Sequence, residues 1–272
     1  MNLIPTQIRT GRFFRLTLAL GLVGGVSHGQ VLLQDDFGGS TVNTSHWETV
    51  INDTTVTGGC ARLNFHVDHH PPPKGNAFRN AGLYGKTFFT MPPASPGLLF
   101  TSRIKVVEPP PKGLNLSFYA IGNGGAGDAE LDFEVLTTGY SGQGRDKCWL
   151  NSWSGGRQNS TWPVLPGFDM CAWNIYQIQW TRAGDVTWFI NGKPVRELKQ
   201  QSFVNRFYDC TPAADKAVRV DVSFWKPRPG WDEAYHDRLD KATTNATYTA
   251  LVDWVDVRTI GATNSYPAGT DK

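Results

Sequence analysis

No stretch of the sequence approaches the roughly 20 consecutive apolar residues that a transmembrane helix needs. The beginning instead has the pattern of a secretory leader. Residues 9–15 carry three arginines and no acid, residues 16–26 are apolar, and residues 27–29 place small residues at the −3 and −1 positions of a cleavage site. An amphipathic surface helix is the alternative interpretation. We expect residues 1–29 to be a signal peptide, and the mature protein to be soluble, secreted (extracellular or periplasmic) and without a membrane partner.

An excess of positive charge is also missing once the leader is set aside. The chain has 26 Lys and Arg against 24 Asp and Glu; three of these basic residues and none of the acids lie in residues 1–29, so the remainder carries a formal charge of −1. Such a chain has no positive field to attract a phosphate backbone, and we expect no nucleic-acid partner. We expect one monomeric domain over residues 30–262, rather than two small ones, and a flexible tail at residues 263–272.

Cysteine is scarce, and its spacing excludes a zinc site. The four cysteines form no C-x-x-C pair and none lies near a histidine in a zinc pattern. An even number in an exported chain favours one or two disulfides. Of the three pairings that four cysteines allow, Cys148 with Cys171 is the bridge we favour. Five Asn-x-Ser/Thr sequons, which matter only in a eukaryotic source, lie at Asn43, Asn52, Asn115, Asn159 and Asn245.

Helix signals are nearly absent, with one weak pattern at residues 232–242, whereas strand signals recur throughout. Runs of β-branched and aromatic residues separated by Gly and Pro predict strands at residues 99–107, 114–121, 129–136, 175–180, 186–190, 218–225 and 248–257. Asn191-Gly192 is a strong hairpin-turn dipeptide. With 29 Gly and 17 Pro in the chain, the pattern predicts an all-β fold, a jelly-roll β-sandwich of two antiparallel sheets.

Three acids alternate along the predicted strand at residues 129–136. Successive side chains of a strand point to opposite faces, so Glu130, Asp132 and Glu134 share one face while the apolar residues between them face a core. A structural strand gains nothing from three carboxylates that repel one another. A solvated acidic strand and a calcium patch are the alternatives from this pattern alone.

The spacing of the two glutamates suits acid–base chemistry on a sugar. Retaining glycosidases need a nucleophilic carboxylate and a protonated carboxyl roughly 5 Å apart. The Cα atoms of Glu130 and Glu134 would lie about 13 Å apart on a strand, so only long side chains that lean together across the shorter Asp132 could meet. Mutual repulsion would also raise one pKa, as a general acid near neutral pH requires.

The pattern Glu130-Leu-Asp132-Phe-Glu134 resembles the E-x-D-x-E motif of glycoside hydrolase family 16, whose concanavalin-like jelly rolls include lichenases, laminarinases, agarases and xyloglucan transglycosylases. Lichenases and transglycosylases use this form without an extra residue; laminarinases and agarases usually have E-x-D-x-x-E. Further similar segments follow in the family's order at residues 34–37, 45–47, 147–153, 173–191, 222–225 and 252–255. The resemblance implies that Glu130 is the nucleophile, Asp132 its hydrogen-bonding partner and Glu134 the acid/base.

The resemblance also indicates which aromatic residues contact substrate. It places one face of the strand that carries Trp149, Asn151 and Trp153 in the cleft, where indoles stack on pyranose rings and the amide binds hydroxyls. Trp225 is similarly placed, with core packing as its alternative. Three other tryptophans, Trp180, Trp188 and Trp254, are expected in the core. Ser223 departs from the family, since lichenases usually have Asn there, which puts the exact glucan in doubt.

Two further features bear on ions. Asp253 matches a position at which several family members bind calcium, so we name it as a metal-ligand candidate for a structural calcium; the chemistry itself requires no cofactor. The basic loop at residues 226–231 would border the cleft, and is either solvated or able to offset the charge of a sulfated substrate.

These inferences predict a retaining endo-glycosidase that hydrolyses a β-linked polysaccharide, a β-1,3-1,4- or β-1,3-glucan by preference. Three alternatives stay open: a transglycosylase on the same scaffold, a hydrolase of sulfated galactans, and a non-catalytic carbohydrate-binding jelly roll. Retention of all three acids disfavours the last, because binding alone does not need a protonated Glu beside a nucleophile.

Overall fold

The computed structural model describes residues 30–50, 53–68, 78–137, 148–200, 212–227 and 245–261. The expected signal peptide, the tail, Cys210 and the weak helical pattern lie outside these ranges. The described chain is almost entirely strand, with a single 3₁₀ turn, η1 (Gly125–Gly127), and it contains no helix that is long and apolar enough to cross a membrane.

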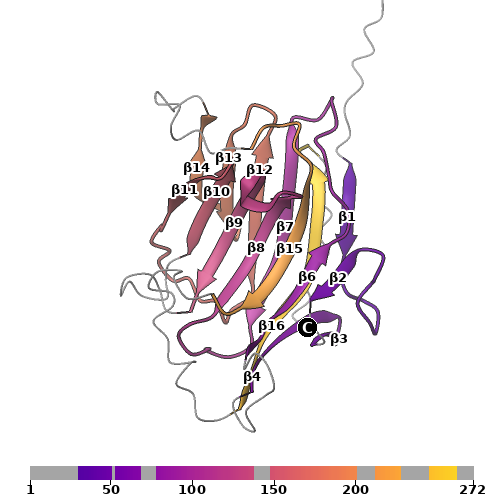
Figure 1. The fold of residues 1–272 in the computed structure, drawn as a ribbon, viewed down its shortest axis with the longest axis vertical. Helices are drawn as coiled ribbons and strands as arrows, with labels where there is room; N and C mark the ends of the chain where they lie inside the picture. Colours follow the sequence, from indigo (N-terminus) through magenta and orange to yellow (C-terminus); the bar gives the residue numbers. More distant parts are fainter. Residues whose placement is uncertain are drawn as a thin grey trace, which may run out of the picture.

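Nine strands form one antiparallel sheet in the order β14-β13-β12-β7-β16-β4-β3, with β1 pairing β16 and β5 pairing β4. Its strands are β1 (Val31–Asp35), β3 (Thr54–Thr57), β4 (Cys60–Val67), β5 (Phe78–Arg79), β7 (Gly97–Val106), β12 (Asn174–Thr181), β13 (Val186–Ile190), β14 (Lys193–Leu198) and β16 (Ala246–Thr259). The second sheet has seven strands in the order β11-β10-β9-β8-β15-β6-β2. They are β2 (Trp47–Val50), β6 (Ala81–Gly85), β8 (Asn115–Gly122), β9 (Ala129–Leu136), β10 (Trp149–Ser154), β11 (Arg157–Thr161) and β15 (Val218–Trp225). The sheets overlap in the view of Figure 1 and form the predicted jelly-roll sandwich.

The core lies between the two sheets because each strand sends alternate apolar residues inward. Leu131, Phe133 and Val135 of β9 belong to this core and are at most 1% exposed. From the facing sheet, the Tyr176 ring meets Phe133 edge-to-face at 5.3 Å between centroids. Trp188 of β13 also contacts β9 across the core. Its Nε1 donates a hydrogen bond to the Asp132 carbonyl of β9 at 3.1 Å. The backbone of β9 is therefore anchored from the opposite sheet.

The three tryptophans expected in the core are all buried. Trp180 and Trp188 are fully buried in the main cluster, and Trp254 is buried to 5% exposure but lies outside that cluster. The ladder of β16 with β7 shifts register between Val252 and Trp254. Such a bulge inserts an extra residue, so Val252 and Val255 both point into the core while the two residues between them do not.

The favoured disulfide is also contradicted. Cys148 is a free thiol just before β10, fully buried, and its Sγ donates to the Glu134 carbonyl at 3.5 Å. Cys171 precedes β12 and is not bridged to it. Because Cys148 has the same parity as the core residue Leu150, its side chain points between the sheets and is used in packing.

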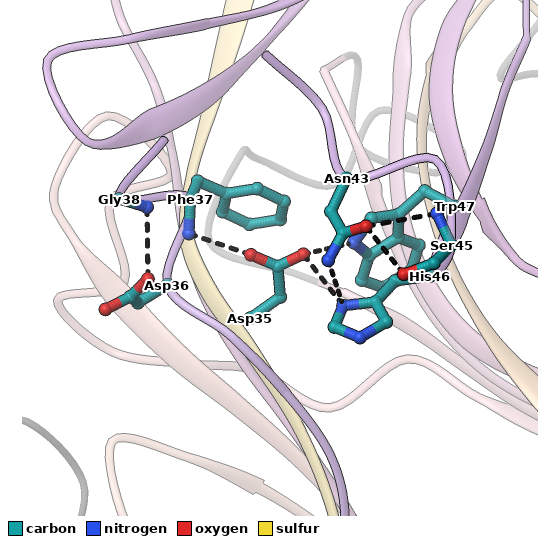
Figure 2. Close-up of polar contacts among 8 residues, drawn as sticks. All are labelled: Asp35, Asp36, Phe37, Gly38, Asn43, Ser45, His46 and Trp47. Carbon is teal, nitrogen blue, oxygen red and sulfur yellow. Dashed lines mark hydrogen bonds and ion pairs between the residues drawn. The ribbon is translucent and has the colours of Figure 1, made fainter. Parts of the chain in front are cut away.

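The first strand connects the edges of the sandwich. β1 pairs with β16, and Gln30 and Thr259 exchange hydrogen bonds at the ends of this ladder. Figure 2 shows how the chain then crosses to the other sheet: the Asp35 carboxylate accepts the Phe37 N–H at 2.9 Å and the Trp47 Nε1–H at 2.8 Å. The motif segments at residues 34–37 and 45–47 thus meet, and they form a structural link between β1 and β2.

Candidate active site

The three acids of β9 share the outer face of the seven-stranded sheet, since the residues between them are in the core. The ladders fix their neighbours. Across β10, Glu134 faces Trp149, Asp132 faces Asn151 and Glu130 faces Trp153. Across β8, the corresponding partners are Ser117, Tyr119 and Ile121. The alternation therefore places the predicted catalytic and substrate-binding residues of β9 and β10 on one surface.

Glu134 is held by two amide side chains. Asn115 Nδ2 donates to Oε1 at 3.0 Å and Asn151 Nδ2 donates to Oε2 at 2.6 Å. Gln158 of β11 fixes Asn151 in turn, because its Nε2 donates to Asn151 Oδ1 at 2.8 Å. Asn151 therefore contacts the Glu134 carboxyl directly, and its expected contact with a sugar stays a prediction. These amides orient both oxygens of Glu134 before any substrate binds.

Burial keeps Glu134 protonated at neutral pH. Its residue is only 6% exposed, and desolvation together with the negative charge of Glu130 raises its pKa to about 8, against the opposing effect of the Asn115 and Asn151 hydrogen bonds. A carboxyl with this pKa holds its proton at pH 7 and becomes a base after giving it away. Glu134 can therefore act as a general acid and then as a general base.

Asp132 and Glu130 shift each other's pKa in opposite directions through a side-chain hydrogen bond. Desolvation, followed by the charges of Glu130 and Glu134, raises the pKa of Asp132 well above its ordinary value. Desolvation also raises the pKa of Glu130, but a hydrogen bond from Asp132 opposes this shift. A protonated Asp132 that donates to Glu130 leaves Glu130 as the ionised partner. The less buried glutamate is thus the better nucleophile.

The aromatic residues predicted from the sequence lie on both sides of β9. Trp149 and Trp153 are half-buried on β10, and Trp149 stacks on Trp162 with 5.0 Å between ring centroids and an interplanar angle of 13°. Trp225, on β15, is also half-buried, and its Nε1 donates to Ser117 Oγ at 2.8 Å. Trp225 therefore faces the site and is not a core residue. Trp162 was not predicted, because it lies beyond the strand pattern of β11.

Another buried acid lies on the same face. Asp221 of β15 is 1% exposed, and desolvation raises its pKa to about 7 against the opposing effect of Arg219. It faces Tyr119 across β8, and Tyr119 faces Asp132 across β9. Desolvation and the nearby Asp221 charge raise the pKa of the Tyr119 phenol well above its usual range, so it remains a hydrogen-bond donor. Sequence reasoning missed Asp221, Tyr119, Asn115 and Gln158 because strand parity shows a shared face only after the strand order is known.

The surroundings of Asp253 do not fit a calcium ion. Its Oδ2 is 2.7 Å from Arg103 Nη1 in a buried ion pair, and its Oδ1 is 3.9 Å from Cys60 Sγ. No three His, Cys, Asp or Glu residues within the described ranges gather as a metal site. A guanidinium that already neutralises the carboxylate opposes a second cation. The structural calcium stays a prediction, which this environment disfavours.

The basic loop enters the described chain only through Lys226 and Pro227. The Lys226 ammonium lies 4.8 Å from the centroid of the Phe78 ring, which belongs to β5 of the other sheet. This cation is therefore engaged with an aromatic ring of the nine-stranded sheet. The remaining residues of the loop lie outside the described ranges.

Known structures share this fold. The endo-β-1,3-glucanase of Pyrococcus furiosus matches with a TM-score of 0.65 at 18% identity, covering 85% of this chain and 94% of its own. A prokaryotic β-1,3-1,4-glucanase (lichenase) from a mouse hindgut metagenome gives 0.60 at 20% identity, covering 83% and 97%. An endo-acting O-glycanase of the human gut microbiota, described in connection with mucin breakdown, gives 0.63 at 16%, covering 84% and 98%. No curated protein matches the chain significantly in sequence.

The family itself follows from a match of the sequence. The model of glycosyl hydrolases family 16 matches residues 99–256, which is more than half of the chain and contains β9 with its three acids. The matched range also includes β8, β10 and β15, the strands that supply the residues around Glu134 and Asp132. The chain belongs to glycosyl hydrolase family 16.

Proposed function

We propose that this protein is a retaining endo-glycosidase that hydrolyses a neutral β-linked glucan. The observation that carries the proposal is the state of the three acids on β9: Glu134 holds a proton at pH 7 and is oriented through both oxygens, while Asp132 donates to Glu130. This combination provides a general acid and an ionised nucleophile on one strand.

In the first step, an oxygen of Glu130 attacks the anomeric carbon while the bond from that carbon to the glycosidic oxygen breaks. Glu134 transfers its proton to the departing oxygen. The hydrogen bond from Asp132 keeps Glu130 ionised before attack and stabilises it as a leaving carboxylate later. The product of this step is a glycosyl ester of Glu130 and a free chain end.

In the second step, Glu134 is a carboxylate and accepts a proton from water. The water oxygen bonds to the anomeric carbon, and the ester bond to Glu130 breaks. Glu134 is again protonated and Glu130 again ionised. Two inversions retain the anomeric configuration. A sugar hydroxyl in place of water would give transglycosylation on the same scaffold.

The charge of the outer face supports a neutral substrate. Five described carboxyl groups lie at outward-facing positions of its strands, Glu48, Glu130, Asp132, Glu134 and Asp221, together with one guanidinium, Arg219. Asp132 and Glu134 hold their protons at neutral pH, but the guanidinium is already paired with Asp221, so these described positions offer a sulfate group no unpaired cation. The names of two structural neighbours, a β-1,3-glucanase and a β-1,3-1,4-glucanase, support β-glucan as the neutral polymer.

We also propose export of the protein and action as a monomer. The arginine-rich, apolar and small-residue pattern of residues 1–29 supports export. A polysaccharide is too large to enter a cell, so an extracellular or periplasmic location suits the substrate.

Conservative changes of the two glutamates test the mechanism. Glu130→Gln and Glu134→Gln should each lower the release of reducing ends from barley β-glucan by at least about a thousandfold while the thermal midpoint is maintained, because each removes one reacting group. For Glu134→Gln, azide should restore turnover with activated aryl glycosides, which need no acid.

The substrate panel consists of barley β-glucan, laminarin, xyloglucan, agarose and carrageenan, with products resolved by chain length and anomeric form. Products with retained configuration from a neutral glucan are expected. Inverted products, or cleavage of carrageenan alone, would overturn the proposal, and products longer than the substrate would identify a transglycosylase. Binding without any cleavage would identify a non-catalytic lectin.

A further inference from the structure

The part of the outer face remote from the indoles of β10 contains an arginine next to two aromatic rings. The Arg219 guanidinium carbon lies 5.5 Å from the ring centroid of Tyr84 and 5.8 Å from that of Phe88. Arg219 belongs to β15, Tyr84 to β6, and Phe88 follows β6. Arg219 has the same strand parity as Asp221, so it shares the face of the three acids.

The buried carboxylate of Asp221 holds the Arg219 side chain in position. Arg219 Nε lies 3.1 Å from Asp221 Oδ1 and 3.2 Å from Oδ2, and the Gly85 N–H donates to Oδ1 at 2.9 Å. A side chain at Gly85 would place its Cβ 2.7 Å from the Val220 carbonyl oxygen, so only glycine permits this close approach of β6. The buried carboxylate therefore fixes the direction of the guanidinium.

The outward side of this cluster remains available. The Arg219 side chain is 29% exposed although its partner Asp221 is 1% exposed. Within the described chain only Nε of Arg219 is hydrogen-bonded, so the terminal amino groups of the fork are free to donate. Phe88 is 36% exposed, so part of its ring is accessible to a ligand. The backbone bridge between Phe89 and Val218 fixes the segment that carries it.

The cluster lies at a distance from β9 that a polymer can span. β8 and β15 are the next strands after β9, and β6 follows β15. At about 4.8 Å between strands, Arg219 is about 10 Å and Tyr84 about 14 Å from β9. A chain that passes between Glu130 and Glu134, which are aligned along β9, must cross the strands. Its continuation beyond β8 would reach this cluster.

We propose that Tyr84, Phe88 and Arg219, hereafter the Arg219 platform, bind a neutral sugar ring of the polysaccharide that is remote from the scissile bond. The apolar face of the ring stacks on Phe88, and the Arg219 fork and the Tyr84 phenol hydrogen-bond to its hydroxyls. Asp221 already offsets the charge of Arg219, and the neighbouring acids disfavour an anionic ring. This inference rests on the proposed function and extends it to long substrates.

The length of the oligosaccharide provides the test, because a short one cannot reach the platform from β9. The measurement is kcat/KM for mixed-linkage β-glucan oligosaccharides from three to eight sugars. Phe88→Ala should lower kcat/KM about tenfold for the longest substrates, through KM, and leave the trisaccharide within twofold of wild type. Arg219→Lys keeps the charge beside Asp221 but loses the fork, and should show the same dependence on length.

Lys105→Ala is the matched control. Lys105 lies 4.7 Å from the centroid of the Trp173 ring, in a similar cation–aromatic contact on the nine-stranded sheet. It should not change kcat/KM at any length. An equal loss for short and long substrates in Phe88→Ala, or no loss for either, would overturn the platform.

A binding measurement separates this inference from the proposed function. Calorimetry of Glu134→Gln with the octasaccharide needs no turnover, and adding Phe88→Ala should weaken binding about tenfold. Unchanged affinity alongside normal wild-type hydrolysis would refute the platform alone. If the octasaccharide binds but wild type cleaves no polysaccharide, the proposed function fails and the platform stands. If Glu134→Gln does not bind it, the β-glucan assignment and the platform both fail.

Discussion

At the scale of single residues, the chemistry depends on amides that carry no charge. Asn115 and Asn151 lower the pKa of Glu134 that burial raises, so their hydrogen bonds set how readily this carboxyl gives up its proton. Asn115 also has an Oδ1 without a hydrogen-bond partner among the described residues. Within the described ranges its amide is hydrogen-bonded only to Glu134, so a change at Asn115 should act mainly on the Glu134 carboxyl.

Replacing Asn115 with Ala should shift the pH dependence of the reaction to higher pH. Loss of a donor to the carboxylate raises the pKa of Glu134 further above about 8. The alkaline limb of kcat/KM, which reports the acid of the free enzyme, should therefore move upward, and kcat should fall by about tenfold or more because the carboxyl is less well oriented.

Asn64→Ala is the control for this change. Asn64 accepts a hydrogen bond from the Thr249 hydroxyl at 2.9 Å within the nine-stranded sheet, whereas β9 belongs to the other sheet. The Asn64→Ala variant should leave the alkaline limb of the kcat/KM profile unchanged. An alkaline limb that stays fixed or moves downward in Asn115→Ala would contradict the function assigned to Asn115.

The residue scale also shows where sequence reasoning stops. Glu130, Asp132 and Glu134 could be assigned to one face because they lie on one strand and strand parity is local. Asn115 begins a sequon, Asn-Leu-Ser, and was noted only as such. Its contact with Glu134 depends on β8 pairing with β9 across a separation of 19 residues. No local pattern contains that register.

At the scale of elements, β9 depends on the opposite sheet. The Trp188 indole of β13 donates to the Asp132 carbonyl, and Arg196 of β14 donates to the Leu150 carbonyl of β10 at 2.6 Å. Both contacts go to backbone atoms of the strands that carry the site. The edge of the nine-stranded sheet therefore positions the active strands.

Trp188→Phe should lower both stability and activity. A smaller aromatic ring is retained and the buried Asp132 carbonyl loses its donor, so the free energy of unfolding in urea should fall by about 1–3 kcal/mol. Because that carbonyl belongs to β9, kcat should fall several-fold as the acids shift.

Trp180→Phe is the comparison that isolates the second effect. The Trp180 Nε1 donates to the Pro212 carbonyl at 3.2 Å and is equally buried, but it does not contact β9. A similar loss of stability with normal kcat is expected. Equal kcat in the two variants would show that the anchor of β9 has no part in catalysis.

Strand positions were predictable where the pattern was regular. β9 and β15 match the expected bounds, and the Asn191-Gly192 turn has the expected positive φ values of 53° and 75°. The bulge at Asp253 was not predictable, because the alternation fails there and only pairing with β7 shows which residue is extra. The same irregularity explains why Trp254, although buried as expected, lies outside the main core cluster.

At the scale of the whole molecule, the site makes stability depend on pH. Glu130, Asp132, Glu134 and Asp221 all have raised pKa values because burial disfavours their charged forms. The folded protein therefore binds more protons than the unfolded chain between their ordinary pKa values, near 4, and the raised ones. Stability from these groups is complete below that window and is lost as pH rises through about 7 for Asp221 and about 8 for Glu134.

The thermal midpoint should accordingly fall between pH 5 and pH 9. Glu134→Gln and Asp221→Asn should each flatten this fall, and the Glu134 variant should become more stable than wild type above pH 8. Calorimetry across the range measures it, with Asp36→Asn as an exposed control that should leave the curve unchanged. A midpoint that rises toward pH 9, or is flat in wild type, would show that burial does not raise the pKa values of these acids.

The pairing of the first strand with the last has a consequence for engineering. Because Gln30 and Thr259 are hydrogen-bonded neighbours, the two ends of the sandwich lie side by side. A circularly permuted chain could join residue 261 to residue 30 through a short flexible linker and open at the Asn191-Gly192 turn. All the ladders could still form, and the new ends would emerge at the turn between β13 and β14 of the nine-stranded sheet. For the same reason the domain could be spliced into a surface loop of a host protein without stretching either partner.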